Sequence, residues 1–168
     1  MLRELHAELG IPDDYGAAGS MPVFDEAAEL VEVGPNLVGR MQRLVPEAAR
    51  QWRAMVAEAD KIGIQLLIVS GFRGFEYQAG LIRKKIEAGQ AIEDILRVNT
   101  APGYSEHHTG RAVDIATPGS RPLTEEFEDT DACRWLGDSA EEFGFSRTDP
   151  RDNPWGIAYE PGHWSLKG

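Results

Sequence analysis

The sequence predicts an α+β fold: a single domain in which a small, partly antiparallel sheet is flanked by helices. Stretches with apolar residues at helical spacing separate short apolar runs that are typical of strands. At 168 residues, the chain is long enough to bury one hydrophobic core. It contains no internal repeat and no low-complexity tract that would divide it into further domains.

The first part of the chain carries the weakest periodic pattern. We expect a short helix over residues 2–9 and a strand over residues 30–33. Residues 1–44 are therefore interpreted as an N-terminal wrap, which belongs to the same domain as the core at residues 45–168.

The clearest helix begins at Pro46, because proline suits a first helical turn, and apolar residues recur at helical spacing up to Gly63. The next segment, residues 64–69, is short and almost wholly apolar. That composition favours a strand that is buried on both faces.

The middle of the chain predicts two helices over residues 75–98, with a break at Gly89. The first of them carries the basic run 83–85, which is interpreted as a solvated helix face. Residues 100–110 are polar and contain Pro-Gly, so they should form a loop that leads into a strand over residues 111–116.

The C-terminal part continues the alternation of helices and strands. A long helix is expected over residues 125–143, ending at Gly144, and a polar loop over residues 146–154. The last strand is expected over residues 155–160, with a short extension at residues 164–165.

The balance of charges restricts the class of partner. A formal net charge of −11 argues against a nucleic-acid binder, because phosphate contacts need a basic surface. The same charge does not attract an anionic ligand, so a carboxylate would have to be held by a few local cations. Arg73 is a candidate for that role.

Cysteine usage and the N-terminus bear on the compartment. The single cysteine, Cys133, is expected to be a small core residue and cannot form an internal disulfide. The sequence as given starts without a secretory signal, and no stretch reaches the roughly 18 apolar residues of a membrane span. We therefore expect a cytoplasmic protein, or one of the cell envelope or periplasm if a signal has been removed.

Histidines are clustered in two short segments, residues 105–114 and 160–164, which hold three of the four in the chain. A hydrolytic zinc site needs three nitrogen or oxygen ligands, an open position for water and a nearby carboxylate that is not a ligand. The two segments together contain side chains for all of these roles.

Spacing selects the individual residues. In the first segment, His107 in the loop and Asp114 in the next strand can approach one metal from two directions, with Gly110 allowing the turn. In the second, Glu160 and His163 flank a Pro-Gly bend, so His163 would bind and Glu160 would act as a base. Each half alone is also compatible with structural hydrogen bonding.

The pattern S-x-H-x-x-G-x-A-x-D at residues 105–114, followed by E-P-x-H-W, resembles the zinc D-alanyl-D-alanine carboxypeptidase family. Ser70-Gly71-Phe72-Arg73 and Gln78 extend the resemblance over residues 64–166. The family includes VanY-type carboxypeptidases, vancomycin-resistance D,D-dipeptidases, L,D-carboxypeptidases and phage L-alanyl-D-glutamate endolysins. The resemblance implies the fold that these peptidases share with the hedgehog signalling domain.

The resemblance also implies a role for individual residues. It implies zinc ligands at His107, Asp114 and His163, a general base at Glu160, and substrate contacts from Arg73, Ser105 and Gln78. Arg73 would hold either the oxyanion of the reaction or the terminal carboxylate of the peptide. One position departs from the pattern, since relatives often have Trp where Gly162 stands.

We therefore expect a monomeric zinc enzyme, with one Zn²⁺ per chain, that releases terminal D-Ala from peptidoglycan stem peptides or muropeptides. Cleavage of an L,D-bond or of the L-alanyl-D-glutamate bond are alternatives. A different class, a non-catalytic zinc-stabilised binding domain, would need a fourth protein ligand, for which Cys133 or His108 are the candidates. Glu160 beside the third ligand favours the enzyme.

Overall fold

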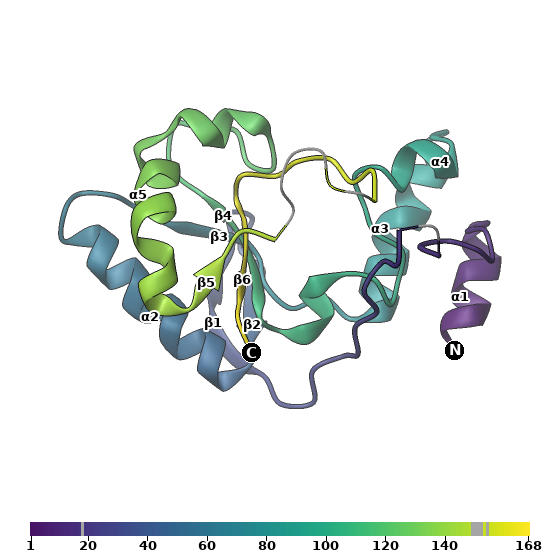
Figure 1. Ribbon diagram of the computed structural model, residues 1–168, viewed down its shortest axis with the longest axis horizontal. Helices are drawn as coiled ribbons and strands as arrows, with labels where there is room; N and C mark the ends of the chain where they lie inside the picture. Colours follow the sequence, from purple (N-terminus) through teal and green to yellow (C-terminus); the bar gives the residue numbers. More distant parts are fainter. Residues whose placement is uncertain (18, 149–152, 154) are drawn as a thin grey trace.

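The computed structural model describes residues 1–17, 19–148, 153 and 155–168. Helices and two small antiparallel sheets form a single α+β domain, as expected (Figure 1). The elements are α1 (Leu2–Leu9), β1 (Val31–Pro35), β2 (Met41–Leu44), α2 (Pro46–Asp60), β3 (Leu67–Ser70), α3 (Phe75–Glu87), α4 (Ile92–Ile95), η1 (Glu106–Thr109), β4 (Ala112–Ala116), η2 (Glu125–Asp129), α5 (Asp131–Ser139), η3 (Ala140–Phe143), β5 (Phe145–Ser146) and β6 (His163–Leu166). Among the described residues, no helix has the length and apolar character needed to cross a membrane.

The larger sheet has the strand order β3-β4-β6-β5, and each neighbouring pair is antiparallel. In β4, Val113 is paired with Trp164 and Asp114 with His163 across the β4–β6 ladder. Because successive side chains of a strand point to opposite faces, Val113 and Asp114 lie on different faces of the sheet.

One face of this sheet forms the main core. The helices α2 and α5 pack against it on the same side of the molecule (Figure 1). The buried residues of this cluster include Leu44, Trp52, Met55, Val113, Ile115, Leu136, Phe145, Trp164 and Leu166. The opposite face of the sheet carries the polar side chains of Asp114 and His163.

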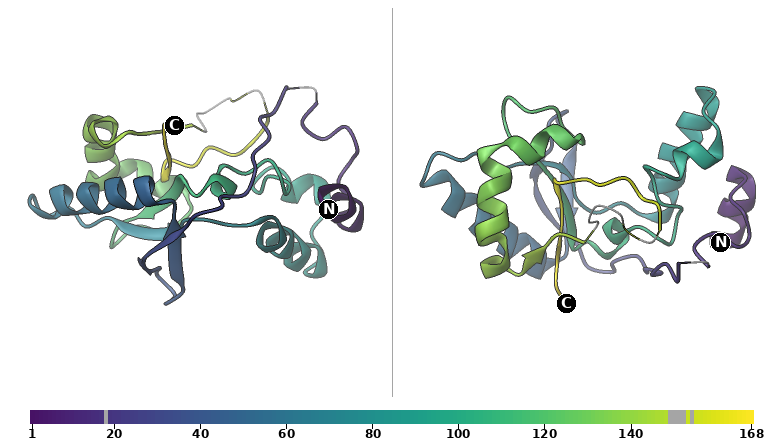
Figure 2. Two further views of the ribbon diagram at one scale, coloured as in Figure 1. Left: turned by 90° about the horizontal axis from the view of Figure 1, so that it is seen from below. Right: turned by 45° about the horizontal axis from the view of Figure 1, so that its top comes forward.

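A second hydrophobic cluster joins the N-terminal helix to the middle of the chain. Leu5 and Leu9 of α1 pack with Ala79 and Ile82 of α3 and with Ile95 of α4. Figure 2 shows these three helices grouped at the end of the molecule away from α2 and α5. The helices predicted over residues 2–9 and from Pro46 are confirmed, as is the break at Gly89.

The strand predicted over residues 64–69 is shorter than expected and is buried on one face. It forms β3, in which Ile68 is buried while Leu67, Val69 and Ser70 are partly exposed. The reason is topological, because β3 is an edge strand of an antiparallel sheet, and such sheets pack one face against a core.

The prediction of a last strand over residues 155–160 is wrong, and the strand is instead β6, His163–Leu166. The Asn153 side chain accepts hydrogen bonds from the backbone N–H groups of Trp155 and Ile157, at 3.1 Å each. Local bonding of this kind competes with a strand ladder. The polar loop expected over residues 146–154 lies largely outside the described residues.

The long helix predicted over residues 125–143 is interrupted. The structure has η2, α5 and η3 in its place, and α5 starts anew because the Thr130 hydroxyl caps it by accepting from the Cys133 N–H at 3.1 Å. Apolar spacing indicated the buried face correctly, since Phe127 and Leu136 are in the core. It did not reveal the cap.

Gly162 stands where the chain passes closest to the sheet. A Cβ atom at this position would lie 2.5 Å from the carbonyl oxygen of Ile115, whose N–H bonds to the Gly162 carbonyl at 2.8 Å. A larger residue at this position would therefore require the backbone to shift away from Ile115.

Replacing Gly162 with Ala is expected to lower the free energy of unfolding by about 1–3 kcal/mol, the usual cost of overpacking. Gly80→Ala is the matched control, because a Cβ there meets nothing within 4 Å and the residue lies inside α3. The control should raise stability by up to about 1 kcal/mol. Urea unfolding of the metal-free proteins measures both, and equal stabilities for parent and Gly162→Ala would refute the close approach.

Candidate active site

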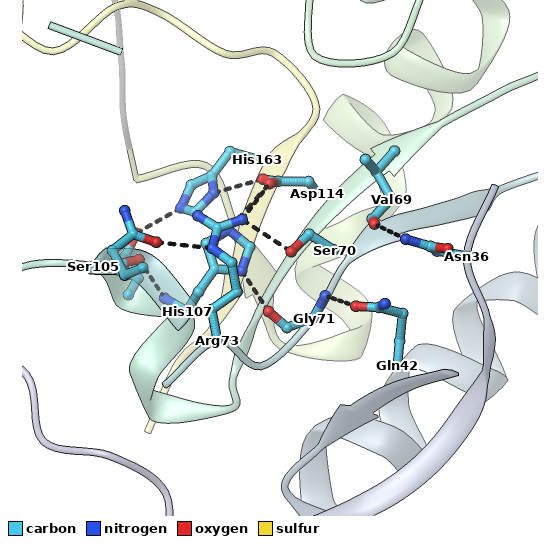
Figure 3. A network of polar contacts seen from close by, with 12 residues as sticks. Asn36, Gln42, Val69, Ser70, Gly71, Arg73, Ser105, His107, Asp114 and His163 are labelled. Carbon is cyan, nitrogen blue, oxygen red and sulfur yellow. Dashed lines mark hydrogen bonds and ion pairs between the residues drawn. The ribbon is translucent and has the colours of Figure 1, made fainter. Parts of the chain in front are cut away.

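Three side chains converge on the polar face of the sheet. His107, Asp114 and His163 are all buried, and one potential ligand atom from each lies within 4.8 Å of the others. His107 Nε2 is 3.1 Å from Asp114 Oδ2, and His163 Nδ1 is 3.0 Å from Asp114 Oδ1 (Figure 3). The structure thus brings together the three residues expected to bind a metal.

Local structure explains how each of the three reaches this point. Asp114 and His163 are direct cross-strand partners in β4 and β6. His107 lies in η1, which Ser105 caps by accepting from the His107 N–H, and which ends at Gly110 in the left-handed conformation with φ 68°. The short helix η1 and the paired strands β4 and β6 therefore hold these three side chains close together.

The His107 ring is oriented from outside the group. Its Nδ1 donates to the Gly71 carbonyl at 2.7 Å, and the Gly71 N–H in turn donates to Gln42 Oε1 of β2 at 2.8 Å (Figure 3). The antiparallel hairpin of β1 and β2 thereby supports the site. With the proton on Nδ1, the lone pair on Nε2 points at Asp114.

That arrangement fits a cation. His107 Nε2 is buried without a hydrogen-bond partner and faces Asp114 Oδ2. The lone pairs of this nitrogen and this oxygen repel each other when no proton or ion lies between them. A divalent ion held by both atoms would remove the repulsion, and a carbonyl on the far ring nitrogen is a usual outer partner of a metal-bound histidine. Two imidazoles and one carboxylate match the donor set of hydrolytic zinc sites.

The charge states favour the same interpretation. Burial alone would raise the pKa of Asp114, but the imidazoles of His107 and His163 outweigh it and hold that pKa well below its usual value. Burial and the Arg73 guanidinium lower the pKa of His107. A carboxylate beside a neutral imidazole is the protonation state in which these groups bind a metal.

Arg73 lies beside the group and is fixed by its neighbours. Its Nη1 donates to Ser70 Oγ at 2.9 Å and lies 3.5 Å from Asp114 Oδ2, while its Nε donates to Gln78 Oε1 at 3.0 Å. Gln78 is fully buried and also donates to the Thr100 carbonyl at 2.8 Å. Its amide therefore positions Arg73 from behind.

The site opens into a cavity of about 600 Å³. Its polar wall includes Glu160, Arg73, Ser105 and Glu106, together with the three proposed metal ligands. Its apolar wall includes Met21, Phe24, Leu81, Val98, Trp155 and Ile157. A cavity of this size, apolar with a few polar groups, suits a short peptide.

The sequence predicted that the basic run of α3, residues 83–85, is a solvated face, but the structure shows that only part of it faces open solvent. Lys84 and Lys85 line the cavity, and the Lys85 ammonium donates to the Asn99 side chain. Arg83 instead pairs with Glu8 of α1 at 2.7 Å. Helical spacing alone does not tell which side of α3 faces a cavity.

Two residues near the proposed metal ligands, Glu106 and Thr148, were not singled out as functional from the sequence. Glu106 accepts from the His163 Nε2 at 2.8 Å and also from the Thr148 hydroxyl. Burial alone would raise the pKa of Glu106, but its contacts with His163 and Thr148 outweigh this and lower it. The sequence offered one hint for Glu106, its place directly before His107, but the S-x-H pattern leaves that position unspecified.

His108 has a structural role. Its Nε2 accepts from the Gly103 N–H at 3.0 Å, and its Nδ1 donates to the Arg73 carbonyl at 2.6 Å. Burial lowers the pKa of His108, in keeping with a neutral ring. Within the described part of the chain, the group able to share an ion includes neither His108 nor Cys133, so it provides no fourth protein ligand.

His107, Asp114 and His163, which could hold a metal ion, lie at the wall of a cavity that Glu160 also lines, and metal-dependent hydrolases use groups of these types. Residues 41–168 match the model of the VanY family, described as D-alanyl-D-alanine carboxypeptidase. The chain belongs to this family. A Bacillus subtilis protein named as a carboxypeptidase, YodJ, is 30% identical over 122 residues, which cover 72% of this chain and 44% of that protein. This chain spans less than half the length of the curated relatives that it matches.

Solved structures share the fold. The LD-carboxypeptidase LdcB superposes with a TM-score of 0.73 at 28% identity, covering 86% of this chain and 71% of that chain. A mutant of the vancomycin-resistance D,D-pentapeptidase VanY, in complex with Zn(II), gives a TM-score of 0.64 at 25% identity, covering 88% and 83%. These neighbours include enzymes of both D,D- and L,D-specificity.

Proposed function

We propose that this chain is a zinc-dependent carboxypeptidase that removes the terminal D-Ala from peptidoglycan stem peptides. The observation that carries the proposal is the buried group of His107, Asp114 and His163 at the wall of a peptide-sized cavity. Membership of the VanY family and the zinc complex of a structural neighbour support it.

His107 Nε2, an Asp114 oxygen and His163 Nδ1 are the atoms that would hold the ion. Bound zinc acidifies a water molecule and polarises the peptide carbonyl. The chain must then move the water's proton. Glu160, at the cavity wall two residues before Gly162, is the group that we assign to accept it and to return it to the leaving amine.

The terminal carboxylate of the substrate needs a cation inside a chain of net charge −11. Arg73 provides it, because its guanidinium is held at the cavity wall by Ser70 and Gln78. Ser105 lines the same wall, although its hydroxyl already accepts from the His107 N–H at 3.2 Å. We assign Ser105 as a substrate contact through its remaining donor.

A second specificity has support of its own. The likeness to LdcB, with a TM-score of 0.73, favours cleavage after an L-residue, that is, an L,D-carboxypeptidase acting on the tetrapeptide. Both reactions release one D-Ala and use the same metal and base. They differ in the residue that the cavity accepts before the cleaved bond.

Mass spectrometry of the products from defined stem tripeptide, tetrapeptide and pentapeptide tests the proposal. The expected result is loss of one D-Ala from the pentapeptide, with accumulation of the tetrapeptide. Conversion of the tetrapeptide to the tripeptide would assign L,D-specificity instead. Release of L-Ala from the start of the stem would assign an endopeptidase, and three intact peptides in the presence of zinc would refute the proposed activity.

Arg73→Lys is expected to lower kcat/KM for the pentapeptide roughly 10- to 100-fold, because hydrogen bonds to charged groups contribute about 1.5–3 kcal/mol. A pentapeptide with a C-terminal amide separates the two roles of Arg73. If Arg73 binds the carboxylate, the parent prefers the free acid and the variant loses that preference. If kcat/KM falls by the same factor for the free acid and for the amide, Arg73 acts on the oxyanion. The exposed Arg50→Ala is the matched control and should behave as the parent.

A further inference from the structure

His163 has a carboxylate on each side of its ring. Its Nδ1 lies 3.0 Å from Asp114 Oδ1, and its Nε2 lies 2.8 Å from Glu106 Oε1. A carboxylate accepts hydrogen bonds, so the Nε2 nitrogen carries the proton of the second contact. The lone pair of Nδ1 would then be available to bind a metal ion.

Glu106 is itself held in place. The Thr148 hydroxyl donates to the same Oε1 atom that accepts from His163. The backbone of Glu106 lies in the first turn of η1, and its side chain is 22% exposed at the cavity wall. Thr148, Glu106 and His163 therefore form a chain of hydrogen bonds that ends on a proposed metal ligand.

We propose that Glu106, supported by Thr148, is a positioning residue for the metal site: it accepts a hydrogen bond from the Nε2–H of His163, and thereby selects the tautomer that would bind through Nδ1 and fixes the plane of the ring. Outer partners of this kind make a histidine a better ligand, and their loss typically costs about 10- to 100-fold in metal affinity. His107 is held in the equivalent way by the Gly71 carbonyl.

This assignment rests on the proposed zinc site but not on which peptide bond is cut. It also separates the two glutamates at the cavity wall. Loss of Glu160 as the base should impair turnover and leave metal binding intact, whereas loss of Glu106 should weaken metal binding itself. The two carboxylates thus have different signatures in the same experiment.

The experiment measures zinc affinity by competition with a chelating dye, and the absorption spectrum of the Co²⁺-loaded protein. Glu106→Ala is expected to weaken zinc binding about 10- to 100-fold and to shift the Co²⁺ bands, because the His163 ring is no longer fixed. Glu106→Gln keeps a hydrogen-bond acceptor and should restore part of the affinity. Thr148→Val should weaken binding by a smaller factor in the same direction.

The exposed Glu87→Ala, at the end of α3, is the matched control and should bind as the parent does. Zinc affinity of Glu106→Ala within about twofold of the parent, with an unchanged Co²⁺ spectrum, would overturn the proposal. If that variant does not fold, parental affinity in both Glu106→Gln and Thr148→Val would overturn it equally. A parent that binds no zinc would refute the metal site as a whole, which is a distinguishable result.

Discussion

The variant Glu160→Gln is expected to bind zinc like the parent and to lose roughly 10²- to 10⁴-fold in kcat, the usual contribution of a general base. The amide has nearly the shape of the carboxylate but cannot accept a proton from water. Because Glu160 lines the cavity and is not a member of the buried ligand group, the metal should remain bound. Turnover of the stem pentapeptide and zinc content are measured on the same preparation.

Glu160→Asp is the matched comparison, since it keeps the acid but withdraws it by one methylene. It should retain more activity than Glu160→Gln. Parental activity in Glu160→Gln would contradict the assignment, and loss of zinc from that variant would indicate that Glu160 is a ligand.

The variant His107→Ala is expected to lose bound zinc and activity together. His107 contributes one of three ligand atoms, so its removal should cost more affinity than the roughly 10- to 100-fold that follows loss of an outer partner. Dialysis against a chelator, followed by metal analysis, measures the loss. Added zinc should restore activity to the dialysed parent and not to the variant.

His6→Ala is the control for this experiment. His6 is a partly exposed histidine of α1 whose Nε2 contacts the Pro102 carbonyl at 2.7 Å, outside the ligand group. It should retain zinc. A His107→Ala protein that keeps one zinc per chain and its activity would remove His107 from the site.

The fold was predictable where the signal is local. Pro46 and the spacing after it mark α2, and the alternation of Val113, Asp114 and Ile115 marks a strand with one polar side chain among core residues. The last strand was misplaced, because an Asn153 side chain bonds the backbone of an apolar segment, and β6 is defined by pairing with the distant β4.

The site was predictable to the extent that it consists of residue types at characteristic spacings. His107, Asp114 and His163 were selected in this way, and the structure brings them together. Glu106 was not, because the motif leaves its position unspecified and its contact with His163 depends on how the loop packs against β6. Gln78 was expected to touch substrate, but its fully buried amide holds Arg73, a relation that depends on packing.

Zinc K-edge X-ray absorption, combined with metal analysis of the reconstituted parent protein, tests the ligand set most directly. We expect one zinc per chain with nitrogen and oxygen neighbours at about 2.0–2.2 Å, and the scattering signature of two imidazole rings. The proposed ligand set would be contradicted by a protein that takes up no zinc, or by a zinc ion with a sulfur neighbour, that of Cys133, at about 2.3 Å.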